Sequence, residues 1–258
     1  MSAIRIGLFA SGDVGYEIAR FLGESGEPPA CLALDANAAA DQNCRTQDAS
    51  TIDPSRVFTS DALLEADTLD TLRGLNLDLL LLAWWPYILR PELIELPRLG
   101  CLNFHPSLLP YNRGKHYNFW ALIEEAPFGV TIHFVDSGVD TGDIAFQAPL
   151  PVTWEDTGAT LYARAQRAIV QLFVDSFPVI RTGRIPRIPQ ARGRGSFHRA
   201  AELEPASRID LDASYTGRAL LNLLRARTFS PHPGAWFVDA GVRYEVRVQI
   251  TRTRPEHG

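Results

Sequence analysis

Residues 77–83 (LDLLLLA) carry the strongest pattern for a buried strand in this chain of 258 residues. A short, almost unbroken apolar run is typical of a strand that is covered on both faces, as in a parallel sheet. Similar runs occur at 4–10 (IRIGLFA) and 30–34 (ACLAL), and helical patterns occupy 14–22 and 61–75. Because strands and helices alternate, the sequence predicts an α/β, Rossmann-like fold built on a parallel sheet.

The alternation continues downstream, with predicted strands at 100–104, 130–135 and 144–152 and a long predicted helix at 156–177. Residues 181–199 then combine Gly, Pro and six Arg without an acidic residue, which is typical of a boundary. A helix at 216–227 and strands at 235–238 and 243–250 are predicted beyond it. We therefore predict three parts: a core domain at 1–183, a linker at 184–205 and a small C-terminal helix-plus-strand unit at 206–258.

The composition and the cysteines indicate the class of protein. The chain is 46% hydrophobic and 21% charged, which excludes a disordered or fibrous protein. Cys31, Cys44 and Cys101 are odd in number and lack C-x-x-C spacing, so they predict reduced thiols rather than disulfides or a zinc ribbon. The first residues do not resemble a secretory signal, and no apolar run approaches the ~20 residues of a membrane span. We expect a cytoplasmic protein with no membrane association.

Positive charge gathers in the last third of the chain. The net charge is −5, but residues 1–180 sum to −12 and residues 181–258 to +7. All but one of the 25 basic residues are arginines, and the exception is Lys115. A basic tail can bind a polyanion such as nucleic acid, or it can form a solvated surface. The charge pattern leaves both interpretations open.

Common cofactor motifs are absent from the sequence. The glycines around the first predicted strand-to-helix turn do not have the G-x-G-x-x-G spacing of dinucleotide sites, and no phosphate-binding G-x-x-x-x-G-K-S/T loop follows. His105, His116 and His133 lack the short helical spacing that zinc sites favour. We therefore expect neither a metal nor a nicotinamide cofactor.

One constellation of polar residues points to chemistry. Asn103 and His105 lie two residues apart at the end of a predicted strand, so their side chains leave the same face. Asp140 follows the next strand on a loop that contains Gly138 and Gly142 and can return to meet them. An amide, an imidazole and a carboxylate suit acyl transfer without a covalent intermediate: two groups stabilise an oxyanion and the third accepts a proton. A strand cap and an ordinary turn are the structural alternative.

These residues resemble a known family. The segments 103–110 (NFHPSLLP) and 139–142 (VDTG) are similar to the signature of the N10-formyltetrahydrofolate-dependent formyltransferases, and the similarity spans about residues 4–183. The resemblance implies a formyltransferase core, N10-formyltetrahydrofolate as the formyl donor and no metal. It also implies that Asn103 polarises the formyl carbonyl, His105 stabilises the oxyanion, and Asp140 assists proton transfer from the amine through water.

The resemblance further implies where the two substrates bind. The donor pocket is expected to contain Trp85, Pro86, Tyr87, Ile88, Leu89, Val135, Gly138, Val139 and Asp143. Its ring-rich first segment suits contacts with a pterin. The acceptor site is expected to contain Gly12, Asp13, Ser107, Asn112, Arg113 and Lys115. A purely structural role for Arg113, bonded to backbone carbonyls, is an equal alternative.

The residues that end and follow the motif favour one class of acceptor. Residues 110–115 (PYNRGK), followed by Asn118-Phe119-Trp120, are similar to the sugar N-formyltransferases, which implies a nucleotide-linked amino sugar, with dTDP as the expected nucleotide. Methionyl-tRNA formyltransferase is the main alternative, because residues 227–237 resemble the opening of its C-terminal domain and the tail is basic. A formyltetrahydrofolate hydrolase is a second alternative. We expect small-molecule substrates rather than nucleic acid, and the family implies a homodimer through the C-terminal unit.

Overall fold

The computed structural model describes residues 4–191 and 193–253 and divides into two compact units. Unit 1 contains the described residues up to His105, together with Val130–Ala148 and Gln166–Ala191. Unit 2 contains Pro106–Gly129, Pro149–Ala165 and the described residues from 193 onward. Two segments that precede residue 183 therefore belong to the same unit as the C-terminal part of the chain. The predicted domain boundaries stay a prediction.

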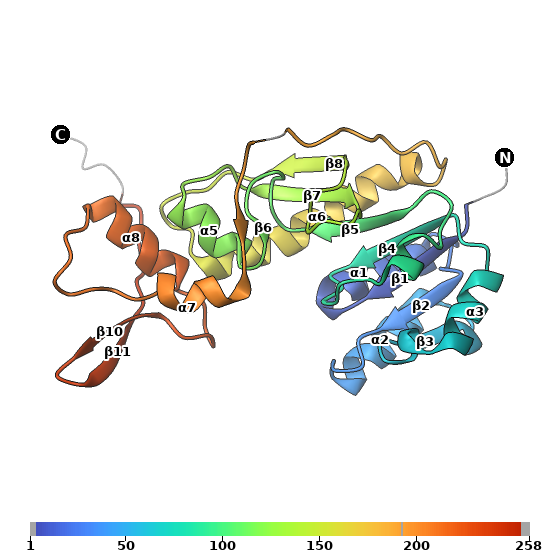
Figure 1. Cartoon of the computed structure of the whole chain (residues 1–258), viewed down its shortest axis with the longest axis horizontal. Coiled ribbons are helices and arrows are strands. Elements are labelled where there is room, and N and C mark those ends of the chain that lie inside the picture. The colour runs from blue at the N-terminus through green and yellow to red at the C-terminus, as the bar shows by residue number, and fades with distance from the viewer. Residues whose placement is uncertain (1–3, 192, 254–258) are drawn as a thin grey trace. The chain divides into compact units, whose positions relative to one another are not determined.

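A seven-stranded sheet with the order β3-β2-β1-β4-β5-β7-β8 forms the centre of unit 1 (Figure 1). Its strands are β1 (Ile6–Ala10), β2 (Cys31–Leu34), β3 (Val57–Thr59), β4 (Leu79–Ala83), β5 (Cys101–His105), β7 (Gly129–Phe134) and β8 (Ile144–Pro149). Strands β1 to β5 are parallel, which confirms the predicted Rossmann-like α/β fold. Strand β7 pairs antiparallel with β5, so the sheet is mostly rather than wholly parallel.

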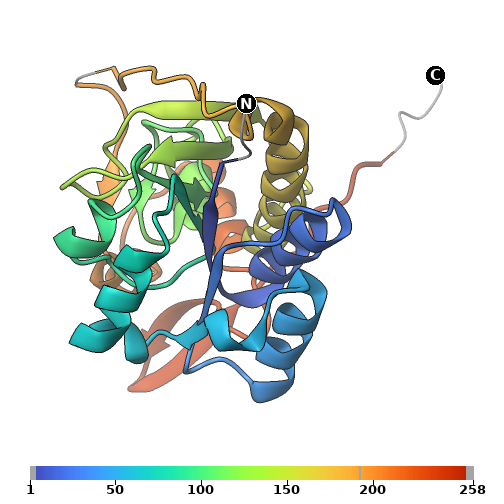
Figure 2. The same cartoon turned by 90° about the vertical axis from the view of Figure 1, so that its right-hand side faces the viewer.

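Helices cover both faces of this sheet. They are α1 (Gly12–Glu24), α2 (Ala40–Ser50), α3 (Ala66–Gly74), α4 (Pro91–Ile94) and α6 (Gly158–Ile180), with 3-10 turns at Pro54–Arg56 and Ala62–Leu64. Figure 2 shows α1 and α6 on one side of the sheet and α3 on the other. On the first side, the Phe21 ring meets Phe173 and Phe177 at 5.6 and 5.2 Å. On the second side, α3 and α4 pack on a buried cluster that includes Cys31 and Cys101. Burial raises the pKa of both thiols to about 12, so they are inert core groups.

Unit 2 is assembled mainly from helices and two short strand pairs. Its elements are β6 (Arg113–Gly114), α5 (Tyr117–Ile123), β9 (Phe197–His198), a 3-10 turn at Ala200–Glu202, α7 (Leu203–Ala206), α8 (Gly217–Ala226), β10 (Ala235–Asp239) and β11 (Val242–Val246). Helix α5 packs against α8, and β10 and β11 form an antiparallel hairpin. The predicted C-terminal helix and strands are therefore confirmed. Across the described ranges, no helix has both the length and the apolar character that crossing a membrane requires.

The Arg-rich segment predicted as a linker packs closely against unit 1 in its first half. Ile188 forms an isolated antiparallel bridge with Ile144. The Arg187 guanidinium lies 3.4 Å from the centre of the Phe134 ring and donates to the carbonyl of Leu99. This anchoring carries Gln190 to the loop that follows β7.

Candidate active site

Strand β5 and its neighbour β7 place three polar side chains together. Asn103 and His105 occupy alternate positions of β5, so both leave the same face of the sheet. In the antiparallel register, Asn103 lies opposite His133 and His105 lies opposite Thr131. Because directly opposed residues share a face, His133 joins Asn103 and His105 on that face.

The loop after β7 brings Asp140 to this group. One carboxylate oxygen of Asp140 lies 3.5 Å from Nδ1 of His105. The other oxygen lies 3.5 Å from Nε2 of His133 and 3.5 Å from Nδ2 of Asn103. The Asp140 side chain is 12% exposed and that of His105 is 6% exposed, so the group is shielded from bulk solvent. The structure thus gathers Asn103, His105 and Asp140, the three residues predicted from the sequence.

A set of hydrogen bonds holds the Asp140 loop in shape. Asp136 accepts from the backbone N–H of Gly138 at 3.0 Å and from the hydroxyl of Thr141 at 2.6 Å. Nε2 of Gln190 donates to the carbonyls of Asp140 and Gly142, both at 2.8 Å. Gln190 lies 50 residues from Asp140, within the predicted linker, and no sequence pattern marks it.

His133 also contributes to the site, although its sequence context suggested only a possible zinc ligand. Its Nδ1 lies 2.8 Å from the carbonyl oxygen of Phe134, so this nitrogen donates and carries the proton. Nε2 is then an acceptor, and Nδ2 of Asn103 donates to it at 3.2 Å. His133 therefore orients the amide of Asn103. The alternation of residues 130–135 was the only sequence signal for this position.

These groups match the demands of acyl transfer. An amide N–H and an imidazole N–H can stabilise the negative charge that develops on a carbonyl oxygen during addition. A neighbouring carboxylate can take a proton from the attacking group. Within the part of the chain that the structure describes, no three His, Cys, Asp or Glu side chains gather in a way that could hold a metal ion.

The residues predicted to bind the donor lie in two loops of unit 1. Trp85 packs between Phe9 and Tyr87, with ring centres 5.2 and 5.4 Å away, and its buried indole N–H has no hydrogen-bond partner among the described residues. Trp85 and Val135, one from each loop, pack against the same buried cluster. Pro86, Tyr87, Ile88 and Leu89 continue the first loop, and Gly138, Val139 and Asp143 continue the second. The sequence-predicted residues of the donor site are thus divided between two loops anchored on one core.

The residues predicted to bind the acceptor are distributed over both units. Gly12 and Asp13 begin α1 in unit 1, and the other four follow β5 in unit 2. The Ser107 hydroxyl donates to the carbonyl of Tyr111 at 2.7 Å, and the buried Asn112 amide donates to Glu124 at 2.9 Å. Nε of Arg113 points to the carbonyl of Ser196 at 3.5 Å, and Lys115 is exposed. Ser107, Asn112 and Arg113 therefore have internal partners, and acceptor binding at these positions stays a prediction.

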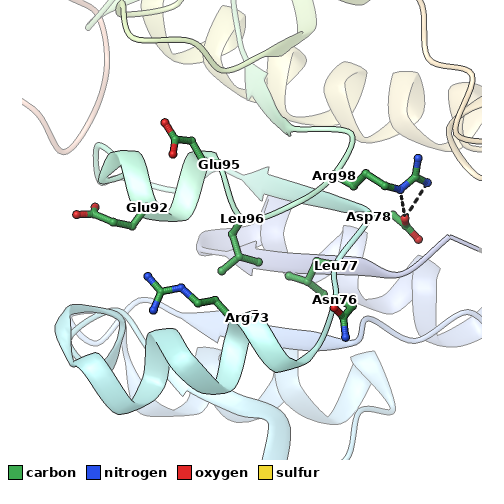
Figure 3. Close-up of a pocket in the computed structure, with 8 residues that line it drawn as sticks. All are labelled: Arg73, Asn76, Leu77, Asp78, Glu92, Glu95, Leu96 and Arg98. Carbon is green, nitrogen blue, oxygen red and sulfur yellow. Dashed lines mark hydrogen bonds and ion pairs between the residues drawn. The ribbon is translucent and has the colours of Figure 1, made fainter.

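A cavity of about 600 Å³ lies in unit 1 away from Asn103, His105 and Asp140. It is lined by Arg73, Asn76, Leu77, Asp78, Glu92, Glu95, Leu96 and Arg98 (Figure 3). Residues 76–78 immediately precede β4, so the cavity lies at the amino edge of the parallel strands, whereas His105 ends β5 at their carboxyl edge. Ligands of open parallel sheets bind at the carboxyl edge, so we assign the candidate active site there.

Comparison with known proteins identifies the family. Residues 27–177, more than half of the chain, match the family model described as formyl transferase. The chain belongs to the formyltransferase family. Residues 202–252 of the chain match a second model, described as the N-formyltransferase dimerization C-terminal domain.

Two curated relatives illustrate the range of acceptors within the family. The chain is 34% identical over 168 residues to a methionyl-tRNA formyltransferase of Synechococcus sp., and the match covers 65% of this chain and 51% of the relative. It is 34% identical over 156 residues to dTDP-4-amino-4,6-dideoxyglucose formyltransferase of Mycobacterium bovis, which covers 60% of this chain and 66% of the relative. The chain spans about half the length of the methionyl-tRNA enzymes that it matches.

Two solved structures share the fold. A sugar N-formyltransferase from a Shewanella species superimposes with a TM-score of 0.80 over 97% of this chain and 99% of its own, at 18% identity, which establishes the fold alone. A formyltransferase from Anoxybacillus kamchatkensis, in complex with UDP-4,6-dideoxy-4-formamido-L-AltNAc and tetrahydrofolate, is 30% identical. That match covers 78% of this chain and 88% of the other, with a TM-score of 0.57.

Proposed function

We propose that this protein transfers a formyl group from N10-formyltetrahydrofolate to the primary amine of a nucleotide-linked amino sugar. The observation that carries the proposal is the clustering of the Asn103, His105 and Asp140 side chains. The Asp140 carboxylate oxygens lie 3.5 Å from Nδ1 of His105 and 3.5 Å from Nδ2 of Asn103. The folate supplies the activated formyl group. Asn103 and His105 donate hydrogen bonds to the carbonyl oxygen as the amine forms a bond to the formyl carbon, and Asp140 accepts, through water, the proton that the amine loses. The bond between the formyl carbon and N10 then breaks, and N10 takes up a proton as tetrahydrofolate leaves.

The proposed donor fits the loops at the carboxyl edge of unit 1. A pterin is a flat ring with polar edges, and it needs both apolar surface and hydrogen-bonding groups. Ile88 is 89% exposed and Val139 is 45% exposed, so each of the two loops presents an apolar side chain. The named Anoxybacillus relative, which binds tetrahydrofolate, supports this choice of donor.

The proposed acceptor rests on the motif and on two relatives. The segments 110–115 and 118–120 resemble the sugar enzymes, and the relatives from Mycobacterium bovis and Anoxybacillus kamchatkensis act on or bind nucleotide-linked amino sugars. We favour dTDP as the nucleotide because the Mycobacterium bovis relative uses it. The cytoplasmic location expected from the sequence stays a prediction.

The arginines of the C-terminal region weaken the tRNA alternative. Four of the described ones form ion pairs within unit 2: Arg218 with Glu125 at 3.2 Å, Arg243 with Glu204 at 2.9 Å, Arg247 with Glu245 at 3.4 Å, and Arg252 with Glu155 at 3.2 Å. Arg225 and Arg227 are buried. A phosphate backbone is bound by guanidinium groups that are free to reach it. Six arginines of the C-terminal region are therefore paired or buried, which leaves fewer guanidinium groups for a phosphate backbone.

The acceptor is tested by measuring tetrahydrofolate release from N10-formyltetrahydrofolate in the presence of different amines. We expect a dTDP-linked amino sugar to raise the rate at least about 100-fold above the rate without acceptor, since sites built around polar groups discriminate strongly. UDP-linked amino sugars and methionyl initiator tRNA serve as the comparison acceptors. Turnover with the charged tRNA alone would overturn the sugar assignment. An equal rate without any acceptor would indicate a hydrolase instead.

We also propose that the hairpin of β10 and β11 joins two copies of the chain. Its face carries Val242, 51% exposed, and Tyr244, 46% exposed and stacked on Phe237 at 5.2 Å. The dimerization model that matches residues 202–252 supports this assignment.

Light scattering of the native protein should give about twice the chain mass of 28.6 kDa. The Val242→Asp variant should be a monomer, because burying the new charge in the interface is costly. The control is Leu64→Asp, which places the same charge at an exposed leucine of unit 1. This variant should stay dimeric. A monomeric native protein, or a dimeric Val242→Asp variant, would contradict the proposal.

A further inference from the structure

Asp35 connects three loops at the carboxyl edge of unit 1. It follows β2, and its side chain is largely buried, with the residue 9% exposed. Oδ1 accepts a hydrogen bond from the hydroxyl of Tyr87 at 2.6 Å and from the backbone N–H of Asn37 at 2.9 Å. Oδ2 accepts from the hydroxyl of Ser11 at 3.4 Å. Since β1 lies between β2 and β4 in the sheet, this carboxylate reaches from the β2 loop past the β1 loop to the β4 loop.

These bonds hold the middle of the segment after β4. The Tyr87 hydroxyl also accepts a hydrogen bond from the side-chain amide of Asn37 at 2.8 Å. The Tyr87 ring packs edge to face against Trp85. Two residues later, Leu89 is buried in the core cluster. Ile88 lies between these two anchors and is 89% exposed. The backbone on both sides of Ile88 is therefore fixed, although its side chain projects into solvent.

A buried carboxylate is a strong anchor for a tyrosine hydroxyl. A hydrogen bond to a charged acceptor contributes more to stability than a bond between neutral groups. All the hydrogen bonds that the Asp35 carboxylate makes with the described residues go to Ser11, Asn37 and Tyr87, and none goes to Asn103, His105 or Asp140. Asp35 is thus suited to shaping a binding loop and not to taking part in the chemistry.

We propose that Asp35 is a positioning residue for the formyl donor, which acts by holding Tyr87 and so presetting the loop Trp85–Leu89. The inference rests on the proposed function, in which this loop binds the folate. A loop that is already in its bound conformation does not lose conformational entropy when the ligand arrives. Releasing Tyr87 should therefore weaken donor binding and leave the chemical step unchanged.

The test compares Tyr87→Phe with the native protein, because this change removes only the hydroxyl and keeps the ring on Trp85. We expect the KM for N10-formyltetrahydrofolate and the Kd for 5-formyltetrahydrofolate each to rise about tenfold. A tenfold rise in Kd corresponds to a loss of about 1.4 kcal/mol in binding free energy. We expect kcat to change less than about twofold, since groups that affect only binding leave it unaltered. Intrinsic tryptophan fluorescence, to which Trp85 beside Tyr87 contributes, follows binding of the ligand.

Asp35→Ala and the double variant test whether the two residues act through one bond. Asp35→Ala should raise the donor KM at least as much as Tyr87→Phe, and adding Tyr87→Phe to it should cause no further rise. Tyr215→Phe is the matched control: Tyr215 is 39% exposed, as Tyr87 is, and its hydroxyl accepts one hydrogen bond from the backbone of Asp210. This control should keep the native KM.

The outcomes separate this inference from the proposed function. If native protein does not bind 5-formyltetrahydrofolate, the proposed donor is wrong. If native protein binds it and Tyr87→Phe binds it equally well, the donor stands and the role of Asp35 is wrong. A fall in kcat with an unchanged donor KM would also overturn the inference, because it would place the tyrosine in the chemical step.

Discussion

Asp140→Asn is expected to lower kcat for formyl transfer about 10³-fold, the magnitude typical of a lost general base. Asparagine has the shape of aspartate but cannot accept a proton from the amine. It also suits the backbone, because Asp140 has φ 54°, a left-handed conformation that asparagine tolerates better than alanine. The fold and the folate affinity should be kept, as measured by thermal unfolding and by titration with 5-formyltetrahydrofolate.

Asp48→Asn provides the control for this prediction. Asp48 is exposed on α2, so its substitution removes one negative charge from unit 1 without touching the carboxyl edge of the sheet. Its kcat should equal that of the native protein. An Asp140→Asn variant that keeps more than about a tenth of the native kcat would exclude Asp140 as the group that receives the proton.

Gly142→Ala is expected to damage the same loop by a steric route. A Cβ at this position would fall on the carbonyl oxygen of Phe134 and lie 2.8 Å from its carbonyl carbon, and both are backbone atoms that cannot turn away. The loop must shift, and Asp140 lies two residues away. We expect a loss of about 1–3 kcal/mol in the free energy of unfolding, as for other overpacked sites. We also expect at least about a 100-fold loss in kcat, because small displacements of catalytic groups are costly.

Gly74→Ala is the matched control in unit 1. Gly74 ends α3, and a Cβ there would meet no atom within 4 Å. This variant should be as stable as the native protein or slightly more stable, because alanine restricts the unfolded chain. Urea unfolding and the tetrahydrofolate-release assay measure both variants. Native stability and activity in Gly142→Ala would show that the loop adapts and that its shape is not critical.

Much of the fold could be predicted because its signals are local. The apolar runs around residues 4–10, 30–34 and 77–83 became β1, β2 and β4, since burial on both faces demands continuous apolar sequence. Helix α2 was not predicted: within Ala40–Ser50 only Thr46 and Ser50 are buried, so no apolar stripe marks it. The antiparallel direction of β7 was also missed, because strand direction leaves no mark on a single strand.

The candidate site could be predicted where strand alternation and a local turn determine the outcome. Asn103 and His105 are brought to one face by the geometry of a single strand, and Asp140 lies on a loop that the glycines mark. His133 and Gln190 could not be found in this way. The role of His133 depends on the register between β5 and β7, and that of Gln190 depends on where the segment beyond α6 packs.

The sequence by itself determined the alternation of strands and helices and the identity of the three polar groups, because periodicity and motif spacing are properties of neighbouring residues. Only the tertiary structure decided which residues orient those groups and where the positive charge of the C-terminal region goes. Asp35 reaches Tyr87 across 52 residues, and Arg218 reaches Glu125 across 93. Such contacts depend on strand order and packing, which join segments whose sequences carry no sign of one another.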